Sequence, residues 1–180
     1  MLGWFEPTFR VGSVCELSPD WLHARQISSL LLDVDCTLKR YRTDSAMPEV
    51  EHWLFEMAAA GVGMCLVSNG RQERIRRFAD RYGLPFVAMA MKPLPLGCRR
   101  AVLAMGFAPP QTALVGDQLF TDMIAGRAAH LRTILVDPIH PEDEPWVTRT
   151  KRPLERWMVG KRDDGEPIHP PQKVNIIPAQ

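Results

Sequence analysis

The sequence predicts an α/β fold in which a Rossmann-like parallel sheet carries helices on both faces. Short apolar runs alternate along the chain with longer stretches of helical character. Several of these runs end at a cluster of polar residues. The chain has 180 residues, 46% of them hydrophobic, which is enough for one packed domain. Strands that alternate with helices favour a parallel sheet, because each helix returns the chain to the edge where the next strand begins.

The predicted strands are short apolar runs of the length typical of buried strands. They are expected at residues 29–34, 63–67, 112–115 and 132–136, with a short fifth strand at 86–88.

The predicted helices are marked by start and stop signals. Pro48 suits the first turn of a helix over 49–60, and Gly83 is a stop signal after a helix over 71–82. Further helices are expected at 21–25, 94–105 and 119–128.

The two ends of the chain differ from this pattern. Residues 1–20 are predicted to be an irregular segment that precedes the domain at 21–140. Residues 141–180 form a proline-rich extension, in which 154–159 is expected to be helical and 162–180 disordered.

Composition excludes several classes of protein. The formal net charge of +1 argues against a general nucleic-acid binder, which normally has a strong basic excess. No apolar run approaches the length of a membrane span, and the N-terminus lacks the features of a secretory signal. The four cysteines have no paired or metal-type spacing, so we expect free thiols and a cytoplasmic protein. The oligomeric state is left open.

Polar residues follow four of the apolar runs. Asp33 and Asp35 follow the first run and Ser68 and Asn69 the second, and the remaining ones are Lys92, Asp117 and Asp122. The carboxyl ends of parallel strands share one edge of the sheet, where active sites of open α/β folds lie. We therefore expect these side chains to meet there.

Asp33 and Asp35 would share one face of a regular strand. Two close carboxylates repel each other unless a cation lies between them or one is protonated. Both solutions suit phosphoryl transfer. One carboxylate can attack phosphorus and form an aspartyl-phosphate, and the other can act as general acid and base.

The other polar residues complete this chemistry. Asp117 offers a further hard oxygen ligand for Mg²⁺. Lys92 offers a compact positive charge for the phosphate, and the Ser68 hydroxyl can donate to a phosphoryl oxygen.

Each residue taken alone has a structural alternative. An aspartate at a strand end is often a helix cap, Ser68-Asn69-Gly70 is typical of a turn, and Lys92 can be a solvated lysine. The order of all these residues, each after its own apolar run, favours the catalytic interpretation.

These residues resemble the four ordered motifs of the haloacid dehalogenase superfamily. The motifs are Asp33-Val34-Asp35-Cys36-Thr37-Leu38, Val67-Ser68-Asn69, Lys92-Pro93 and Gly116-Asp117 with Asp122. The longer segments 115–122, 133–136 and 148–157 resemble the YqeG-type branch of subclass IIIA, which includes phosphatidylglycerophosphate phosphatases. The resemblance covers roughly residues 13–159.

The resemblance implies a role for each motif residue. Asp33 would be the nucleophile and Asp35 the general acid/base. Mg²⁺ would be held by Asp33, the backbone carbonyl of Asp35 and Asp117, with Asp122 in support. The phosphate-binding group would be Thr37, Ser68, Asn69 and Lys92, with Thr37 also positioning Asp35. Two positions depart from the pattern. Cys36 stands where relatives usually have Asn or an acidic residue, and Gly70 where the branch often has Asn.

The resemblance also implies a capless enzyme, because only a short loop and one helix separate Asp35 from the second strand. An open site suits a bulky phosphate monoester such as a phospholipid head group, with peripheral contact to the membrane. Trp4, Phe5 and residues 154–158 are candidates for that contact. Arg71, Arg74, Arg77 and Arg81 can line one side of a helix, as a surface for anionic head groups or as a solvated basic face.

Two other functions stay open. A phosphatase could act on a soluble nucleotide, sugar phosphate or phosphoprotein. A non-enzymatic phospho-acceptor module would use similar residues on a parallel sheet, but Asp35 argues against it, because a base beside the phospho-aspartate promotes its hydrolysis.

Overall fold

The structure is a computed structural model that describes residues 6–41, 43–140 and 142. Almost all of the predicted extension at 141–180, including its helix and its disordered end, lies outside the described residues. The same holds for Trp4 and Phe5.

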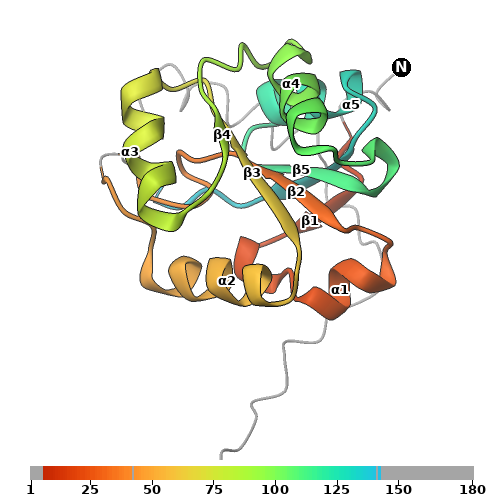
Figure 1. The fold of residues 1–180 in the computed structure, drawn as a ribbon, viewed down its shortest axis with the longest axis horizontal. Coiled ribbons are helices and arrows are strands. Elements are labelled where there is room, and N and C mark those ends of the chain that lie inside the picture. The colour runs from red at the N-terminus through yellow and green to blue at the C-terminus, as the bar shows by residue number, and fades with distance from the viewer. Residues whose placement is uncertain (1–5, 42, 141, 143–180) are drawn as a thin grey trace, which may run out of the picture.

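One parallel sheet of six strands forms the centre of the molecule (Figure 1). The spatial order is β1-β6-β5-β2-β3-β4, and every neighbouring pair is parallel. The strands are β1 (Phe9–Val11), β2 (Ser29–Leu32), β3 (Gly63–Val67), β4 (Phe86–Val87), β5 (Thr112–Gly116) and β6 (Arg132–Val136). The predicted Rossmann-like α/β fold is therefore confirmed.

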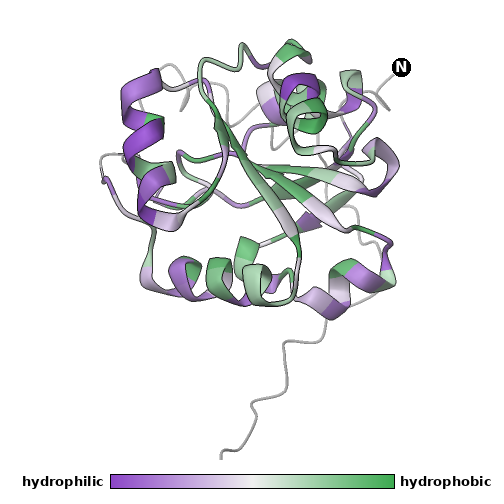
Figure 2. Cartoon of the chain, in the orientation of Figure 1, coloured by the Kyte–Doolittle hydropathy of each residue, from purple (hydrophilic) through white to green (hydrophobic). Residues whose placement is uncertain are grey.

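Helices cover both faces of this sheet, as predicted (Figure 1). One face packs against α1 (Pro19–Ala24), α2 (Pro48–Ala59) and α3 (Gln72–Tyr82). The other packs against α4 (Leu96–Met105) and α5 (Ile124–Ala128). The strands are apolar while the outer sides of the helices are largely hydrophilic, which Figure 2 shows most clearly for α3. This pattern is typical of a sheet that is buried on both faces.

The helix boundaries follow from local signals. Pro48 occupies the first turn of α2, and Ser18 caps α1 by accepting a hydrogen bond from the Trp21 amide. Helices α3 and α4 end at Gly83 and Gly106, which have left-handed φ angles of 63° and 65°. Glycine adopts this backbone at little cost, so it ends helices well.

The prediction of an irregular segment over residues 1–20 is wrong for Phe9–Val11. These residues form β1, which pairs with β6 so that Phe9 lies opposite Ile134. The Thr8 hydroxyl accepts a hydrogen bond from the Thr133 amide at the same edge. The strand has only three residues, with the polar Arg10 at its centre, so its local sequence carries no clear strand pattern. The pairing with distant β6 is what makes it a strand.

A second difference concerns the predicted helix over 119–128. Its first part, Leu119–Met123 (η4), is a π-helical turn that leads into α5. Such turns are frequent at functional sites, and this one carries Asp122.

The topology places the site at the centre of the sheet. From β2 the chain runs outward through β3 and β4, and then returns to β5 on the other side of β2. The crevice between the carboxyl ends of β2 and β5 is therefore a topological switch point, where open α/β sheets bind ligands. The described residues between β2 and β3 form only a loop and α2, so the structure carries no cap domain there. Among the helices described, none is long and apolar enough to cross a bilayer.

Candidate active site

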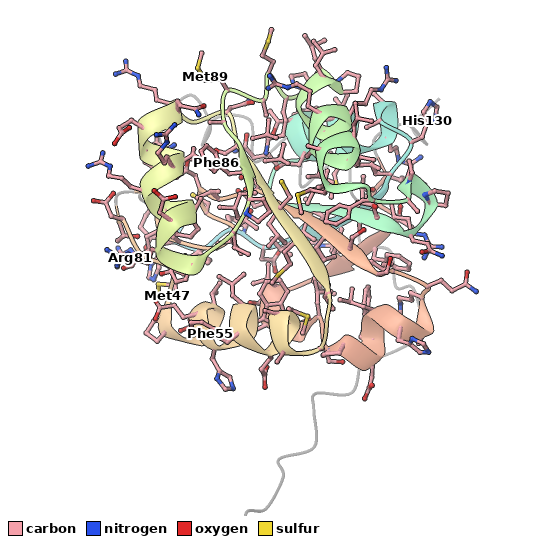
Figure 3. The ribbon with its side chains drawn as sticks, viewed as in Figure 1. Met47, Phe55, Arg81, Phe86, Met89 and His130 are labelled. Atoms are coloured by element: carbon pink, nitrogen blue, oxygen red, sulfur yellow. The ribbon has the colours of Figure 1, made fainter. Side chains whose placement is uncertain are left out.

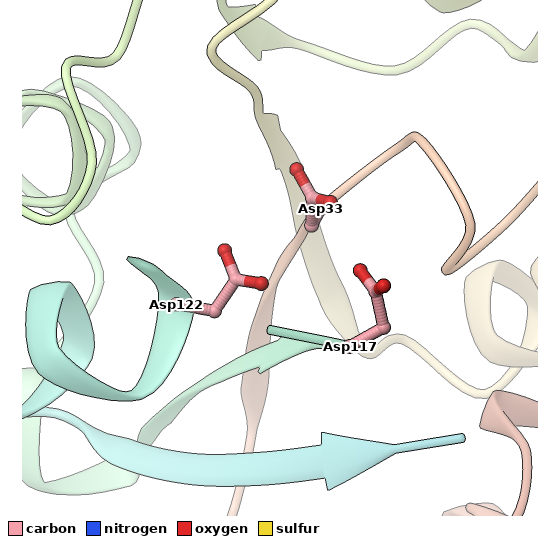
Figure 4. Close-up of side chains that lie close together, drawn as sticks. All are labelled: Asp33, Asp117 and Asp122. Carbon is pink, nitrogen blue, oxygen red and sulfur yellow. The ribbon is translucent and has the colours of Figure 1, made fainter. Parts of the chain in front are cut away.

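Three buried carboxylates meet at the switch point (Figure 4). Asp33 follows β2, Asp117 follows β5, and Asp122 comes from the π-helical turn. One oxygen from each lies within 4.8 Å of the others. The structure thus brings together three of the predicted residues that are far apart in the sequence.

Lys92 balances part of this negative charge. Its Nζ lies 2.6 Å from Oδ1 of Asp33 and 2.7 Å from Oδ1 of Asp122, and the lysine is only 6% exposed. Burial alone would lower the pKa of Lys92, but Asp122 and Asp33 raise it well above its usual value. The two carboxylates therefore favour the charged form of Lys92 at the centre of the site.

The pKa of Asp33 is raised to about 8. The main cause is burial, which disfavours the charged form. The carboxylates of Asp122 and Asp117 raise it further, while Lys92 lowers it. Three carboxylates and one lysine leave an excess of negative charge in a buried place.

This donor set fits a divalent cation. Mg²⁺ prefers hard carboxylate oxygens, and a cation among them would relieve the repulsion that raises the pKa of Asp33. Gly116 is part of the fit, because a Cβ atom at this position would overlap the Asp122 carboxyl group. Its missing side chain lets Asp122 approach β5. Asp117 is held in turn by the Thr37 hydroxyl, which donates to its Oδ1 at 3.1 Å.

The side chain of Asp35 belongs to a different cluster. Arg74 on α3 donates to both of its carboxylate oxygens at 2.6 Å, in a bidentate ion pair. The buried Lys39 lies 2.9 Å from Oδ1 of Asp35. Burial tends to raise the pKa of Asp35, but the Arg74 hydrogen bonds and the Lys39 charge bring it below its usual value. In this arrangement Asp35 is ionised.

Gly70 provides the space that Arg74 occupies. A Cβ atom at Gly70 would overlap the guanidinium of Arg74 and the side chain of Ile75. The departure from the family pattern at Gly70 therefore has a structural consequence. It lets an arginine of α3 reach the second aspartate of the first motif.

Ser68 and Asn69 follow β3 and have different surroundings. The Ser68 hydroxyl accepts a hydrogen bond from the Gly70 amide at 3.1 Å and lines the cavity, so its proton can be donated to a ligand. The Asn69 amide makes two hydrogen bonds to the backbone of Lys92, one to the carbonyl at 2.9 Å and one from the N–H at 2.8 Å. This pair fixes the backbone from which the Lys92 side chain extends.

An open cavity of about 460 Å³ gives access to these groups. Its walls include predicted site residues and others that the motifs did not indicate. The latter are Tyr41, Arg71, Arg74, Gln118 and Thr121. The sequence indicates Arg71 and Arg74 only as part of a helix side that is a surface for anionic head groups or a solvated basic face, and it gives no signal for Lys39. Its contacts arise from a turn in which Asp35 and Lys39 form an isolated bridge.

Two buried cysteines, Cys65 and Cys98, are poor candidates for a nucleophile because their thiols have raised pKa values. Burial raises the pKa of the Cys65 thiol to about 11 and is the main cause that raises the pKa of Cys98 to about 12. Both thiols stay protonated near neutral pH, whereas a thiolate is the reactive form.

Comparison with known proteins agrees with this geometry. A family model described as haloacid dehalogenase-like hydrolase matches residues 12–130. The chain belongs to this family. The predicted membership in the haloacid dehalogenase superfamily is therefore confirmed. The names of the relatives support the prediction that the protein is a phosphatase.

The chain is similar to three curated relatives over different shares of its length. The chain is 32% identical over 152 residues to the probable phosphatase YqeG of Bacillus subtilis (strain 168), covering 84% of this chain and 88% of the relative. It is 32% identical over 106 residues to a phosphoserine phosphatase of Thermus thermophilus, covering 53% and 43%. It is 31% identical over 90 residues to the chloroplastic phosphatidylglycerophosphate phosphatase 1 of Chlamydomonas reinhardtii, covering 49% and 33%.

Solved structures agree on the fold. The deoxy-D-mannose-octulosonate 8-phosphate phosphatase of Haemophilus influenzae superimposes with a TM-score of 0.52 at 15% identity, covering 76% of this chain and 91% of that one. A protein of Xanthomonas campestris superimposes with a TM-score of 0.53 at 19% identity, covering 74% and 79%.

Proposed function

We propose that this protein is a Mg²⁺-dependent phosphatase that hydrolyses a phosphate monoester through an aspartyl-phosphate on Asp33. The observation that carries the proposal is the environment of Asp33. This carboxylate is paired with Lys92, lies beside Asp117 and Asp122, and faces an open cavity. Asp33, Asp117 and the backbone carbonyl of Asp35 would hold Mg²⁺, with Asp122 in support. When bound, Mg²⁺ would supply positive charge to neutralise the phosphoryl oxygens.

In the first step, an oxygen of Asp33 forms a bond to phosphorus while the ester oxygen leaves. Lys92 and the Ser68 hydroxyl bind the phosphoryl oxygens, and Asp35 gives a proton to the leaving oxygen. In the second step, Asp35 takes a proton from water. The water oxygen bonds to phosphorus, and the bond from phosphorus to Asp33 breaks.

The structure suggests two refinements of the roles predicted from the motifs. Both polar atoms of Asn69 contact the Lys92 backbone, so we assign Asn69 to positioning Lys92 rather than to binding phosphate. Thr37 contacts Asp117, so its role would be to orient a metal ligand.

Arg74 must also release one oxygen of Asp35 during the reaction. In its present position it occupies both oxygens of Asp35, and one of them has to face the leaving group. A phosphate dianion in the cavity would compete for Arg74 and add negative charge beside Asp35. Both effects raise the pKa of Asp35 and favour its protonation before the first step.

For the substrate, we propose phosphatidylglycerophosphate, in phospholipid synthesis. The name of the algal relative supports this substrate. The absence of a cap between β2 and β3 and the arginines at the cavity wall suit a bulky substrate with a second anionic group. A soluble substrate is the second candidate, and the phosphoserine phosphatase relative favours it. Membership in a hydrolase family argues against a phospho-acceptor module without turnover.

The test is phosphate release from phosphatidylglycerophosphate and from a panel of soluble phosphate monoesters, each with Mg²⁺ and with EDTA. We expect turnover that requires Mg²⁺ and favours the lipid. Turnover of soluble esters alone would exclude the lipid as substrate and leave the phosphatase assignment intact.

Asp33→Asn is the control variant for this assay. The amide has the same shape but is not a nucleophile and is a poorer metal ligand, so we expect loss of turnover with the fold retained. Activity like that of the wild type in this variant would refute the proposed mechanism.

A further inference from the structure

Large exposed hydrophobic side chains gather in one short part of the chain. Among the described residues, seven such side chains are exposed, and five of them lie between residues 89 and 103. They are Met89, Met91, Leu94, Leu96 and Leu103. We call these five residues the 89–103 surface. Single exposed hydrophobic residues are normal, but a contiguous group indicates an interaction site.

The 89–103 surface borders the mouth of the active-site cavity. The Met89 amide donates to the Gly70 carbonyl at 3.0 Å, and Met91 directly precedes Lys92. Gly70 and Lys92 both line the cavity. Met89 and Met91 therefore lie beside the cavity through which a substrate reaches Asp33.

Helix α4 extends this surface away from the cavity. Leu96, Arg100 and Leu103 are separated by four and three positions, so they share one side of the helix. All three are exposed. The opposite side of α4 packs on the sheet through Cys98 and Ala101. The outward side thus combines apolar side chains with a positive charge.

The exposed charged side chains near the 89–103 surface are positive. The sequence contains no Asp or Glu from Arg81 to Gly116, while the exposed Arg99 and Arg100 fall within this stretch. Arg71 adds an exposed cation at the cavity wall. Apolar side chains mixed with arginines, without acidic residues, suit a surface that is negatively charged and has an apolar layer beneath it. A bilayer with anionic lipids has this character.

We propose that the protein lies on anionic membranes through the 89–103 surface, with the active-site cavity open toward the lipid head groups. This inference rests on the proposed phospholipid substrate, because the surface would bring Asp33 to a phosphate that stays in the membrane. Met89, Met91 and Leu94 enter the head-group layer beside the cavity mouth. Arg100 and Arg71 meet the anionic head groups around them.

The test is co-sedimentation of the purified protein with vesicles of phosphatidylcholine, with and without phosphatidylglycerol. The variant is the triple substitution Met89→Gln, Leu94→Gln and Leu103→Gln, which leaves Met91 beside Lys92 unchanged. Phe55→Gln is the matched control. Phe55 and Met89 are each 63% exposed, and Figure 3 shows them on opposite sides of the molecule.

We expect the wild type and Phe55→Gln to bind the vesicles that contain phosphatidylglycerol. The triple variant should bind them about tenfold more weakly or worse, because three apolar side chains no longer enter the membrane. Arg100→Glu should also weaken binding, most strongly at low salt. Hydrolysis of a soluble ester with Mg²⁺ should be unchanged in the triple variant, and its circular dichroism should match that of the wild type.

Three results would overturn the proposal. The wild type could fail to bind anionic vesicles, or Phe55→Gln could weaken binding as much as the triple variant. The third is a wild type that does not bind vesicles and sediments as a dimer, while the triple variant sediments as a monomer. The 89–103 surface would then join two copies of the chain. The soluble-ester assay keeps these results separate from a failure of the proposed phosphatase activity.

Discussion

At the residue scale, Gly70 and Arg74 help to set the orientation and the pKa of Asp35. The space at Gly70 admits the guanidinium, and the guanidinium holds both oxygens of the carboxylate. Neither residue is among those to which the resemblance gave a catalytic role. The second aspartate of the first motif is therefore controlled by a side chain from a helix that follows the second motif.

Arg74→Gln tests this control. We expect kcat for a soluble ester to fall about tenfold, because Asp35 loses its orienting partner. Arg74 lowers the pKa of Asp35, so its removal raises that pKa. Asp35 must be ionised to act as a base, so the acidic limb of the pH profile of kcat should move to higher pH. Arg76→Gln, on an exposed part of the same helix, should change neither kcat nor its pH profile.

Gly70→Asn is an independent way to displace Arg74. The new side chain would take the space of the guanidinium, so this variant should show the same direction of change as Arg74→Gln. Steady-state kinetics that match the wild type would contradict a role for the Arg74–Asp35 pair in catalysis.

Asn69 gives a second prediction at this scale. Asn69→Ala removes both hydrogen bonds to the Lys92 backbone. We expect KM for a soluble ester to rise and kcat to fall, together by about 10- to 100-fold in kcat/KM, because the Lys92 ammonium is less well placed. An Asn69→Ala enzyme with unchanged KM and weaker thermal stability would indicate a purely structural role.

At the element scale, Trp53 joins α2 to the segment that follows β1. Its indole N–H donates to the Leu17 carbonyl at 2.8 Å, and the side chain is buried in the core that covers one face of the sheet. This contact helps to hold the N-terminal segment, and with it the edge strand β1, against the domain.

Trp53→Phe should therefore lower the free energy of unfolding by about 1–3 kcal/mol, because the Leu17 carbonyl loses its partner in a buried place. Urea unfolding measures this difference. Activity at 25 °C should be unchanged, since Trp53 does not line the cavity. His52→Ala is the control on the same helix, where the exposed pair with Glu56 should contribute little.

At the scale of the whole molecule, the proposed metal site would couple stability to Mg²⁺ through the three buried carboxylates. Mg²⁺ that binds only the folded protein should raise the free energy of unfolding, by about 2.7 kcal/mol at 100 times its Kd. Thermal unfolding in Mg²⁺ and in EDTA measures the effect. Asp117→Asn should abolish this increase. In EDTA it should be more stable than the wild type, because Asp117 repels Asp33. If Mg²⁺ stabilises the wild type and Asp117→Asn equally, the metal binds at another site.

Local sequence determined most of the framework. The apolar runs predicted five of the six strands, and Gly83 marked where α3 ends. The polar residues after the runs indicated the edge of the sheet where Asp33, Asp117 and Lys92 meet. These features are predictable because hydrophobic periodicity and helix termination depend on neighbouring residues, and parallel strands bring their carboxyl ends to one edge.

Only the tertiary structure decided the rest. The edge strand β1 exists through pairing with β6, which is distant in the sequence. The Arg74–Asp35 pair depends on how closely α3 approaches the loop after β2. Cys36 lies in the same loop and has a left-handed backbone with φ of 62°. The apolar surface beside the cavity arises because Met89, Met91 and Leu103 find no place in the core. Each of these features depends on contacts between segments far apart in the chain, and no local pattern encodes them.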